Sequence, residues 1–80
     1  MNMFQTLCVQ FVERAEYLGL KGKAREAQCL SFFVGAATAL QNIDHPEAGH
    51  LLGCTSMILT VRGYGEVVKV AKEAQQRAAA

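Results

Sequence analysis

Residues 23–41 constrain the fold most, because they form a long helical segment with apolar side chains on two faces. One face would hold Ala27, Leu30, Phe33 or Val34, Ala37 and Leu40, and the other would hold Cys29, Phe32, Ala36 and Ala39. Apolar residues at three- and four-residue steps are typical of a helix, and a helix that is apolar on both sides is buried on both sides. We therefore expect a central helix that packs against its own chain on one side and against a second subunit on the other.

The chain is short for so apolar a composition. Its 80 residues allow one domain spanning residues 1–80, and 51% of them are apolar while only 19% are charged. A domain of this size buries roughly 60–65% of the surface that its unfolded chain exposes, so it is marginally stable alone. We expect it to be completed by homo-oligomerisation. The predicted interface combines small and apolar residues of the second and third helices: Phe32, Gly35, Ala36, Ala39, Gly53 and Met57.

Three further helices are predicted, which makes the fold class all-α. The first covers residues 2–18 and ends at Gly19, which can adopt the left-handed conformation after the last turn. The architecture that we expect is a small antiparallel helical bundle of three long helices and a shorter C-terminal helix.

The third and fourth predicted helices cover residues 46–62 and residues 65 or 66 to 77, and a frayed tail is expected at 78–80. Asp44 and His45 are alternative caps for the third helix, with Pro46 in its first turn. Gly63 and Gly65 leave a second possibility open, in which the two helices form one kinked helix.

Charge and cysteine content exclude several classes of protein. The formal charge is +1 and the pI is about 7.7, so DNA or RNA binding is not expected. The three cysteines lie in apolar helical runs without metal-knuckle or redox spacing, which predicts buried thiols in a reducing compartment. No signal peptide and no apolar run of ~20 residues is visible, so we expect a soluble cytoplasmic protein without a membrane partner.

A glycine-broken basic stretch precedes the second helix and is the first candidate binding site. Lys21, Gly22, Lys23 and Arg25 would surround the positive end of that helix, where backbone N–H groups favour a phosphate or a carboxylate. In an antiparallel bundle, Arg62 and Tyr64 would lie at the same end and complete a site for a nucleotide or for an acidic partner. The alternatives are a solvated turn and a Tyr64 side chain folded back onto the helix end.

Glu47, His50 and Cys54 form a second candidate site, because residues at these steps share one helical face and each can ligate a metal. The inner faces of the other helices offer no Asp or Glu for a di-iron centre, so this metal site ranks third among the hypotheses. No nucleophile, base and orienting group occur together, so we expect neither catalysis nor a resident cofactor.

The segment YLGLKGKAREAQCLSFFVGAATAL, residues 17–40, resembles the short helical accessory proteins that bacteriophage genomes encode. The resemblance implies a role in blocking a host protein or in sequestering a small nucleotide signal. The leading hypothesis is a non-catalytic inhibitor or adaptor that masks a host or partner protein. The alternative is a sponge for a phosphorylated small molecule such as a cyclic nucleotide, and the third is a metal-binding bundle.

Overall fold

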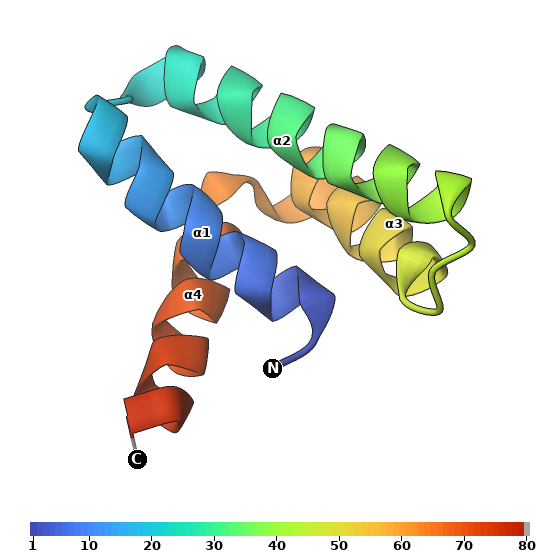
Figure 1. Cartoon of the computed structure of the whole chain (residues 1–80). Coiled ribbons are helices and arrows are strands. Elements are labelled where there is room, and N and C mark those ends of the chain that lie inside the picture. The colour runs from blue at the N-terminus through green and yellow to red at the C-terminus, as the bar shows by residue number, and fades with distance from the viewer. Residues whose placement is uncertain (80) are drawn as a thin grey trace.

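The computed structural model describes residues 1–79 and consists of helices joined by short turns (Figure 1). The elements are α1 (Met3–Leu18), α2 (Gly22–Asn42), α3 (Ala48–Met57), the π-helical turn η1 (Ile58–Arg62) and α4 (Tyr64–Ala79). The all-α prediction is confirmed, and α4 extends two residues beyond its predicted end. Of the predicted frayed tail, Ala80 lies outside the described residues. None of the helices within residues 1–79 combines the length and the apolar character needed to cross a membrane.

Local sequence signals set both ends of α1. Asn2 caps the helix, since its side chain accepts the Gln5 backbone N–H at 2.8 Å and the Gln5 side chain accepts the Asn2 N–H at 3.0 Å. At the other end Gly19 has φ +66°, and the Leu20 N–H donates to the Ala15 carbonyl at 2.9 Å. The predicted stop at Gly19 is therefore confirmed.

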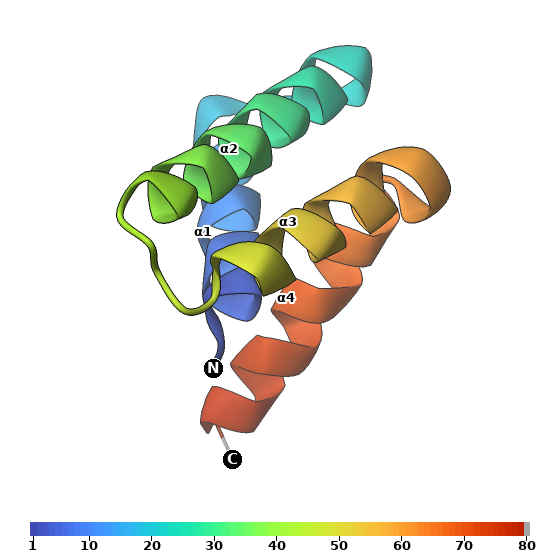
Figure 2. The same cartoon turned by 90° about the vertical axis from the view of Figure 1, so that its right-hand side faces the viewer.

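The helices are arranged around α1, which contacts each of the other three. Two views show α2 and α3 side by side, while α4 packs mainly against α1 and extends away from α2 (Figures 1 and 2). An aromatic cluster joins α1 to α2: the ring centroids are 5.8 Å apart for Phe4 and Phe33 and 5.4 Å apart for Phe11 and Phe32. The centre of the molecule is thus the first helix.

Within residues 1–79 the second helix packs against its own chain on one side, and its burial against a second subunit on the other side stays a prediction. Only Cys29, Phe33 and Ala37 of α2 are buried, and Leu30 and Val34 are 40% and 44% exposed. The physical reason is that α4 covers α1 and leaves the outer side of α2 uncovered within this chain. The helix carries apolar residues on both faces, as its sequence predicts, but residues 1–79 bury only one of these faces.

The third and fourth helices are separate. The backbone widens into the π-helical turn η1 after Met57, and Gly63, with φ +66° and ψ −167°, changes the chain direction before α4 starts at Tyr64. The Gly63 N–H donates to the Ile58 carbonyl at 2.6 Å, which closes the wide turn. Glycine suits this position because few other residues adopt such a backbone conformation.

The start of α3 also differs from its prediction, since the helix begins at Ala48 and not at Pro46. Asp44 takes a positive φ of 52° and forms part of the turn. The His45 Nδ1 accepts the Glu47 backbone N–H at 3.0 Å within this turn. Both predicted caps are wrong, because the N-cap of α3 is Glu47, where no side chain forms a cap hydrogen bond.

Candidate functional sites

The structure brings the start of α2 against the start of α4 through Arg25 and Tyr64. The Arg25 guanidinium carbon lies 4.2 Å from the centroid of the Tyr64 ring, a cation–π contact. The same ring meets Phe11 edge-on, with centroids 5.8 Å apart. Partial burial raises the pKa of Tyr64, and the nearby Arg25 charge opposes that rise. Tyr64 is thus folded back on the core, and its ring is in contact with protein groups.

The remaining basic residues of the predicted anion site behave differently from Arg25. Arg62 forms an ion pair with Glu66 at 3.7 Å, one turn away on the next helix. Lys21 and Lys23 are exposed, and no carboxylate within residues 1–79 pairs with either of them. Gly22 opens α2 with φ +57°, and the Lys21 side chain forms no cap hydrogen bond.

A small pocket lies beside Tyr64, between α2 and η1. Its volume is about 140 Å³, and it is lined by Glu26, Cys29, Ile58, Leu59, Gly63 and Tyr64. The carboxylate of Glu26 in this lining is unfavourable for a phosphate, because like charges repel. The pocket therefore does not extend the predicted anion site, although its lining shows that Leu59 lies next to α2.

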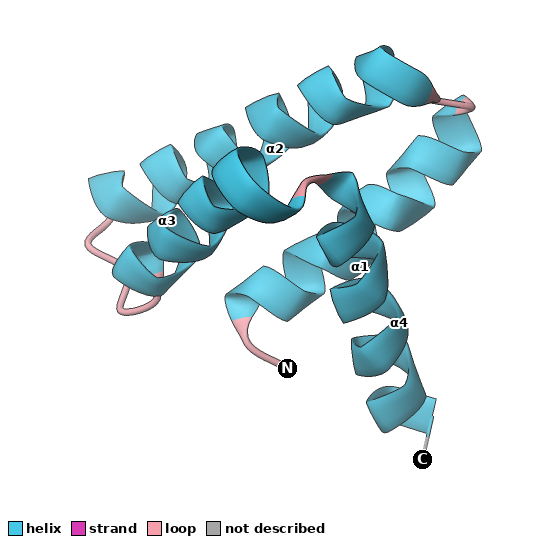
Figure 3. Cartoon of the chain, turned by 180° about the vertical axis from the view of Figure 1, so that it is seen from behind, coloured by secondary structure: helices cyan, strands magenta, loops and turns pink. Residues whose placement is uncertain are grey.

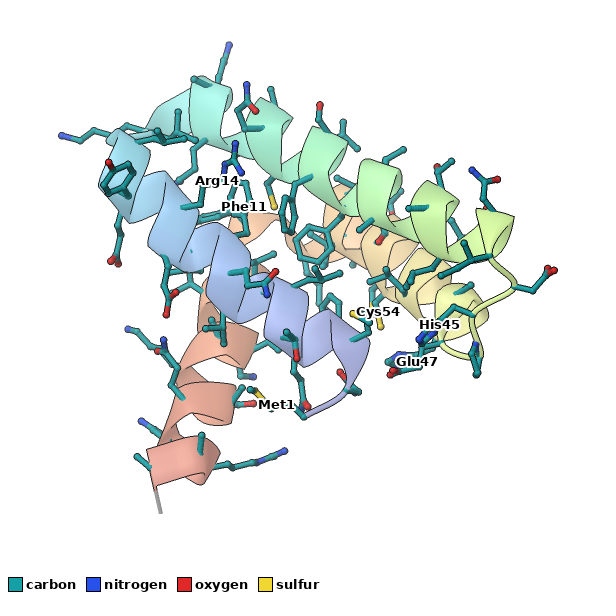
Figure 4. All side chains as sticks on the ribbon, in the orientation of Figure 1. Met1, Phe11, Arg14, His45, Glu47 and Cys54 are labelled. Carbon is teal, nitrogen blue, oxygen red and sulfur yellow. The ribbon has the colours of Figure 1, made fainter. Side chains whose placement is uncertain are left out.

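The predicted metal-ligand set is divided in the structure. The Glu47 carboxylate accepts the Met3 backbone N–H at 3.0 Å and so connects α3 to the first turn of α1. Cys54 and His50 remain a pair, with 3.6 Å between Sγ and Nε2. Figure 4 shows Glu47 close to His45 on the α2–α3 connection. Within residues 1–79 no three His, Cys, Asp or Glu side chains converge, so the structure does not bring Glu47, His50 and Cys54 together as one ligand set.

All three thiols are protonated at neutral pH. Burial raises the pKa of Cys8 from 9.0 to about 12 and that of Cys29 to about 11, and it also raises the pKa of Cys54. Negative charge on Cys29 and Cys54, once these thiols ionise at high pH, and on Glu66 adds to the rise of the Cys8 pKa, and that on Glu26 adds to the rise of the Cys29 pKa. A nucleophilic cysteine requires the thiolate, so none of these environments activates a thiol.

The most extensive feature is a surface without charge on α2 and α3. All 8 basic and 7 acidic residues lie outside residues 27–42 and 48–61. These two segments run side by side (Figures 2 and 3), and we call them the α2–α3 layer. Charge patterning along the sequence could have revealed it, since the gaps in the charge distribution are visible before the fold is known.

Exposed apolar side chains gather along this layer. Leu30 and Val34 lie one turn apart on α2, and Leu52 and Leu59 lie two turns apart on α3 and η1. All four are at least 40% exposed. Leu59 lines the pocket next to α2 and so lies beside the contact between the two helices. Exposed apolar groups that are this closely grouped are typical of an interaction surface.

The predicted oligomer interface is partly used inside the chain. The Phe32 ring contacts Phe11 in a tilted and Phe33 in an edge-to-face arrangement, and Ala36 is packed against the core. The other predicted interface residues are exposed: Gly35, Ala39, Gly53 and Met57. A Cβ atom added at Gly35 or Gly53 would meet nothing within 4 Å, so the surface above both glycines is open.

Comparison of the chain with protein-family models, with curated proteins and with solved structures finds no significant match.

Proposed function

We propose that the chain is a non-catalytic binding protein that forms a homodimer through its α2–α3 layer and masks a partner protein with its α1–α2 turn. The observation that carries the proposal is the separation of charge from apolar surface. The layer carries exposed leucines and valine without a charged residue, whereas the turn carries lysines beside an exposed tyrosine. A phage-type inhibitor or adaptor role, implied by the resemblance of residues 17–40, fits this division into two surfaces.

The layer suits a second copy of the chain. Burial of a charge in an interface carries a large desolvation penalty, and a layer without charges avoids it. In a two-fold dimer the same patch lies on both subunits, so Gly35 and Gly53 would allow the two backbones to approach closely. A standard interface buries about 800 Å² per partner, roughly a sixth of the 5144 Å² surface of this chain. Two exposed helix faces can supply that area.

Lysine substitutions within the layer should dissociate the dimer. We expect light scattering after size exclusion to give about twice 8.7 kDa for the wild type and 8.7 kDa for Val34→Lys and Leu52→Lys. Both positions are exposed in the monomer, so the added charge should disturb the interface and leave the fold intact.

The matched control is Leu18→Lys on α1, which is 54% exposed and lies outside the layer. It should keep the mass of the wild type. A wild-type chain that elutes as an 8.7 kDa monomer at high concentration would exclude the dimer, and so would equal effects of all three substitutions.

The α1–α2 turn has the composition of a contact surface for an acidic partner. Tyr17 is 89% exposed, and Leu18 follows it at the end of the helix. Lys21 and Lys23 come next, and within residues 1–79 neither lysine has a carboxylate partner. Tyrosine is a frequent anchor of protein interfaces, and complementary charge around it guides the partner and fixes its orientation.

Photo-crosslinking from position 17 tests the masking role. A benzophenone amino acid at Tyr17 is expected to capture one cellular protein with an acidic surface, and Lys21→Glu with Lys23→Glu should abolish the product. The control pair Lys69→Glu and Lys72→Glu changes the charge by the same amount on α4 and should have no effect. A product that tolerates both pairs, or no product, would contradict the masking role.

The nucleotide sponge is the alternative function at this end of the molecule. It is supported by the contact of Arg25 with Tyr64 beside the exposed lysines, and opposed by Glu26 in the neighbouring pocket. A sponge would be stabilised by about 2.7 kcal/mol at a ligand concentration of 100 times Kd. A thermal shift with one nucleotide, in the absence of a crosslinked protein, would therefore select the sponge over the inhibitor.

A further inference from the structure

His50, Cys54 and Met57 follow one another along one face of α3. Their spacing of four and then three residues places them above each other on the helix surface. His50 and Met57 are exposed and Cys54 is half-buried, so all three donor groups can be reached from solvent. Leu52 and Leu59 belong to another side of the helix.

The separation of the first two donors matches the span of one metal ion. The Sγ of Cys54 lies 3.6 Å from the Nε2 of His50. With metal–sulfur and metal–nitrogen bonds of about 2.3 and 2.1 Å, a single ion separates its two donor atoms by about 3.6 Å at a tetrahedral angle and about 3.8 Å at a trigonal one. The pair can therefore chelate an ion in the side-chain conformations that it already adopts.

The third donor indicates which metal fits. The thioether of Met57 is a soft ligand, and soft sulfur ligands together with imidazole favour Cu(I) over the harder divalent ions. The nearest carboxylate on this face belongs to Glu47, and it is engaged with the backbone N–H of Met3. We propose that His50, Cys54 and Met57 bind one Cu(I) ion per chain, with nitrogen, thiolate and thioether as ligands.

Binding exchanges a proton for the metal. The thiol of Cys54 loses its proton to solvent as the copper–sulfur bond forms, and the copper remains in its +1 state throughout. The thiolate and the ion together carry no net charge, which suits a half-buried sulfur on a helix without other charged residues. All three ligands come from one chain, and they lie within residues 48–61 of the α2–α3 layer that we propose for the dimer.

The test is a competition for copper under anaerobic conditions. The reduced chain is titrated into Cu(I) bicinchoninate, and the loss of the coloured complex reports transfer of the metal. We expect one copper per chain, an ultraviolet thiolate-to-copper absorption and, in native mass spectrometry, a mass gain of one copper minus one proton. Cys54→Ser and His50→Ala should weaken binding by at least about 10- to 100-fold.

Two further variants identify the ligands. Met57→Leu should weaken Cu(I) binding about tenfold or more and leave Zn(II) binding unchanged, since zinc rarely uses a thioether. Cys29→Ala removes a buried thiol and should retain the metal. Circular dichroism of each variant checks that the helices remain intact.

Three outcomes would overturn the proposal. The first is a wild-type chain that takes no copper from bicinchoninate. The second is copper binding that survives Cys54→Ser, which would assign the metal to the buried thiols. The third is binding of Zn(II) with no effect of Met57→Leu on either metal, which would make the face a two-donor zinc site.

Discussion

Phe11→Ala is expected to lower the free energy of unfolding by about 3–5 kcal/mol, the range measured for large aromatic truncations in protein cores. The side chain is 2% exposed, and it contacts Phe32 of α2 and Tyr64 of α4. The substitution therefore weakens two helix contacts at once. A chain of this size has a total stability of roughly 4–12 kcal/mol, so a large part of it depends on this one ring. Urea unfolding followed by circular dichroism, at one fixed protein concentration, gives the value.

Tyr17→Ala is the matched control, since it removes a ring of similar size from the same helix. Its side chain is 89% exposed, so we expect a change within about 0.5 kcal/mol. If Phe11→Ala is unfolded without urea, Phe11→Leu provides a smaller and measurable loss. A loss of less than about 1 kcal/mol for Phe11→Ala would show that the core is not centred on α1.

Alkaline pH should unfold the protein through its buried thiols. Burial raises the pKa of Cys8 to about 12 and that of Cys29 to about 11, while in the unfolded chain both titrate near 9.0. Above pH 9 the unfolded chain loses these protons and the folded chain retains them, so the stability present below pH 9 is lost as the pH rises. Each thiol contributes about 1.4 kcal/mol per pH unit, and by pH 11 the two together remove about 5 kcal/mol.

Urea midpoints measured at half-unit steps from pH 7 to pH 11 would show this loss, with a plateau below about pH 8.5 and a steep fall above it. The double variant Cys8→Ala with Cys29→Ala should have a much shallower fall, whatever its stability at neutral pH. Cys54→Ala, which removes a less buried thiol, should keep most of the wild-type slope. Equal slopes for the wild type and the double variant would contradict the role of the thiols.

Local sequence signals predicted the helices well, because they act between residues close together in the chain. The apolar period of α1 and the glycine at its end gave its boundaries within one residue. The start of α3 was displaced by two residues because Asp44 took a left-handed turn conformation and the N-cap is Glu47. The π-helical turn at Ile58–Arg62 has no comparable sequence signal, and it was missed.

The candidate sites depended more strongly on distant contacts. The sequence identified Arg25 and Tyr64 as candidate residues of the anion site. Only the packing of α4 on α1 showed that the Arg25 guanidinium lies 4.2 Å from the centroid of the Tyr64 ring. Glu47 was assigned to a metal set from its helical spacing, whereas its carboxylate accepts a hydrogen bond from Met3, 44 residues away. Helical spacing specifies which residues share a face, and it contains no information on which face another helix covers.

The same distinction applies to the second helix, whose two apolar faces were evident from its residues alone. Composition and periodicity were sufficient to establish an all-helical chain with more apolar surface than 80 residues can bury. Which of the two faces would be covered was decided by the tertiary structure, because α4 packs mainly against α1 and does not cover the outer side of α2. The outer sides of α2 and α3 are therefore both exposed. This charge-free layer exists because α4, which is distant from α2 in the sequence, packs on α1 and does not cover it.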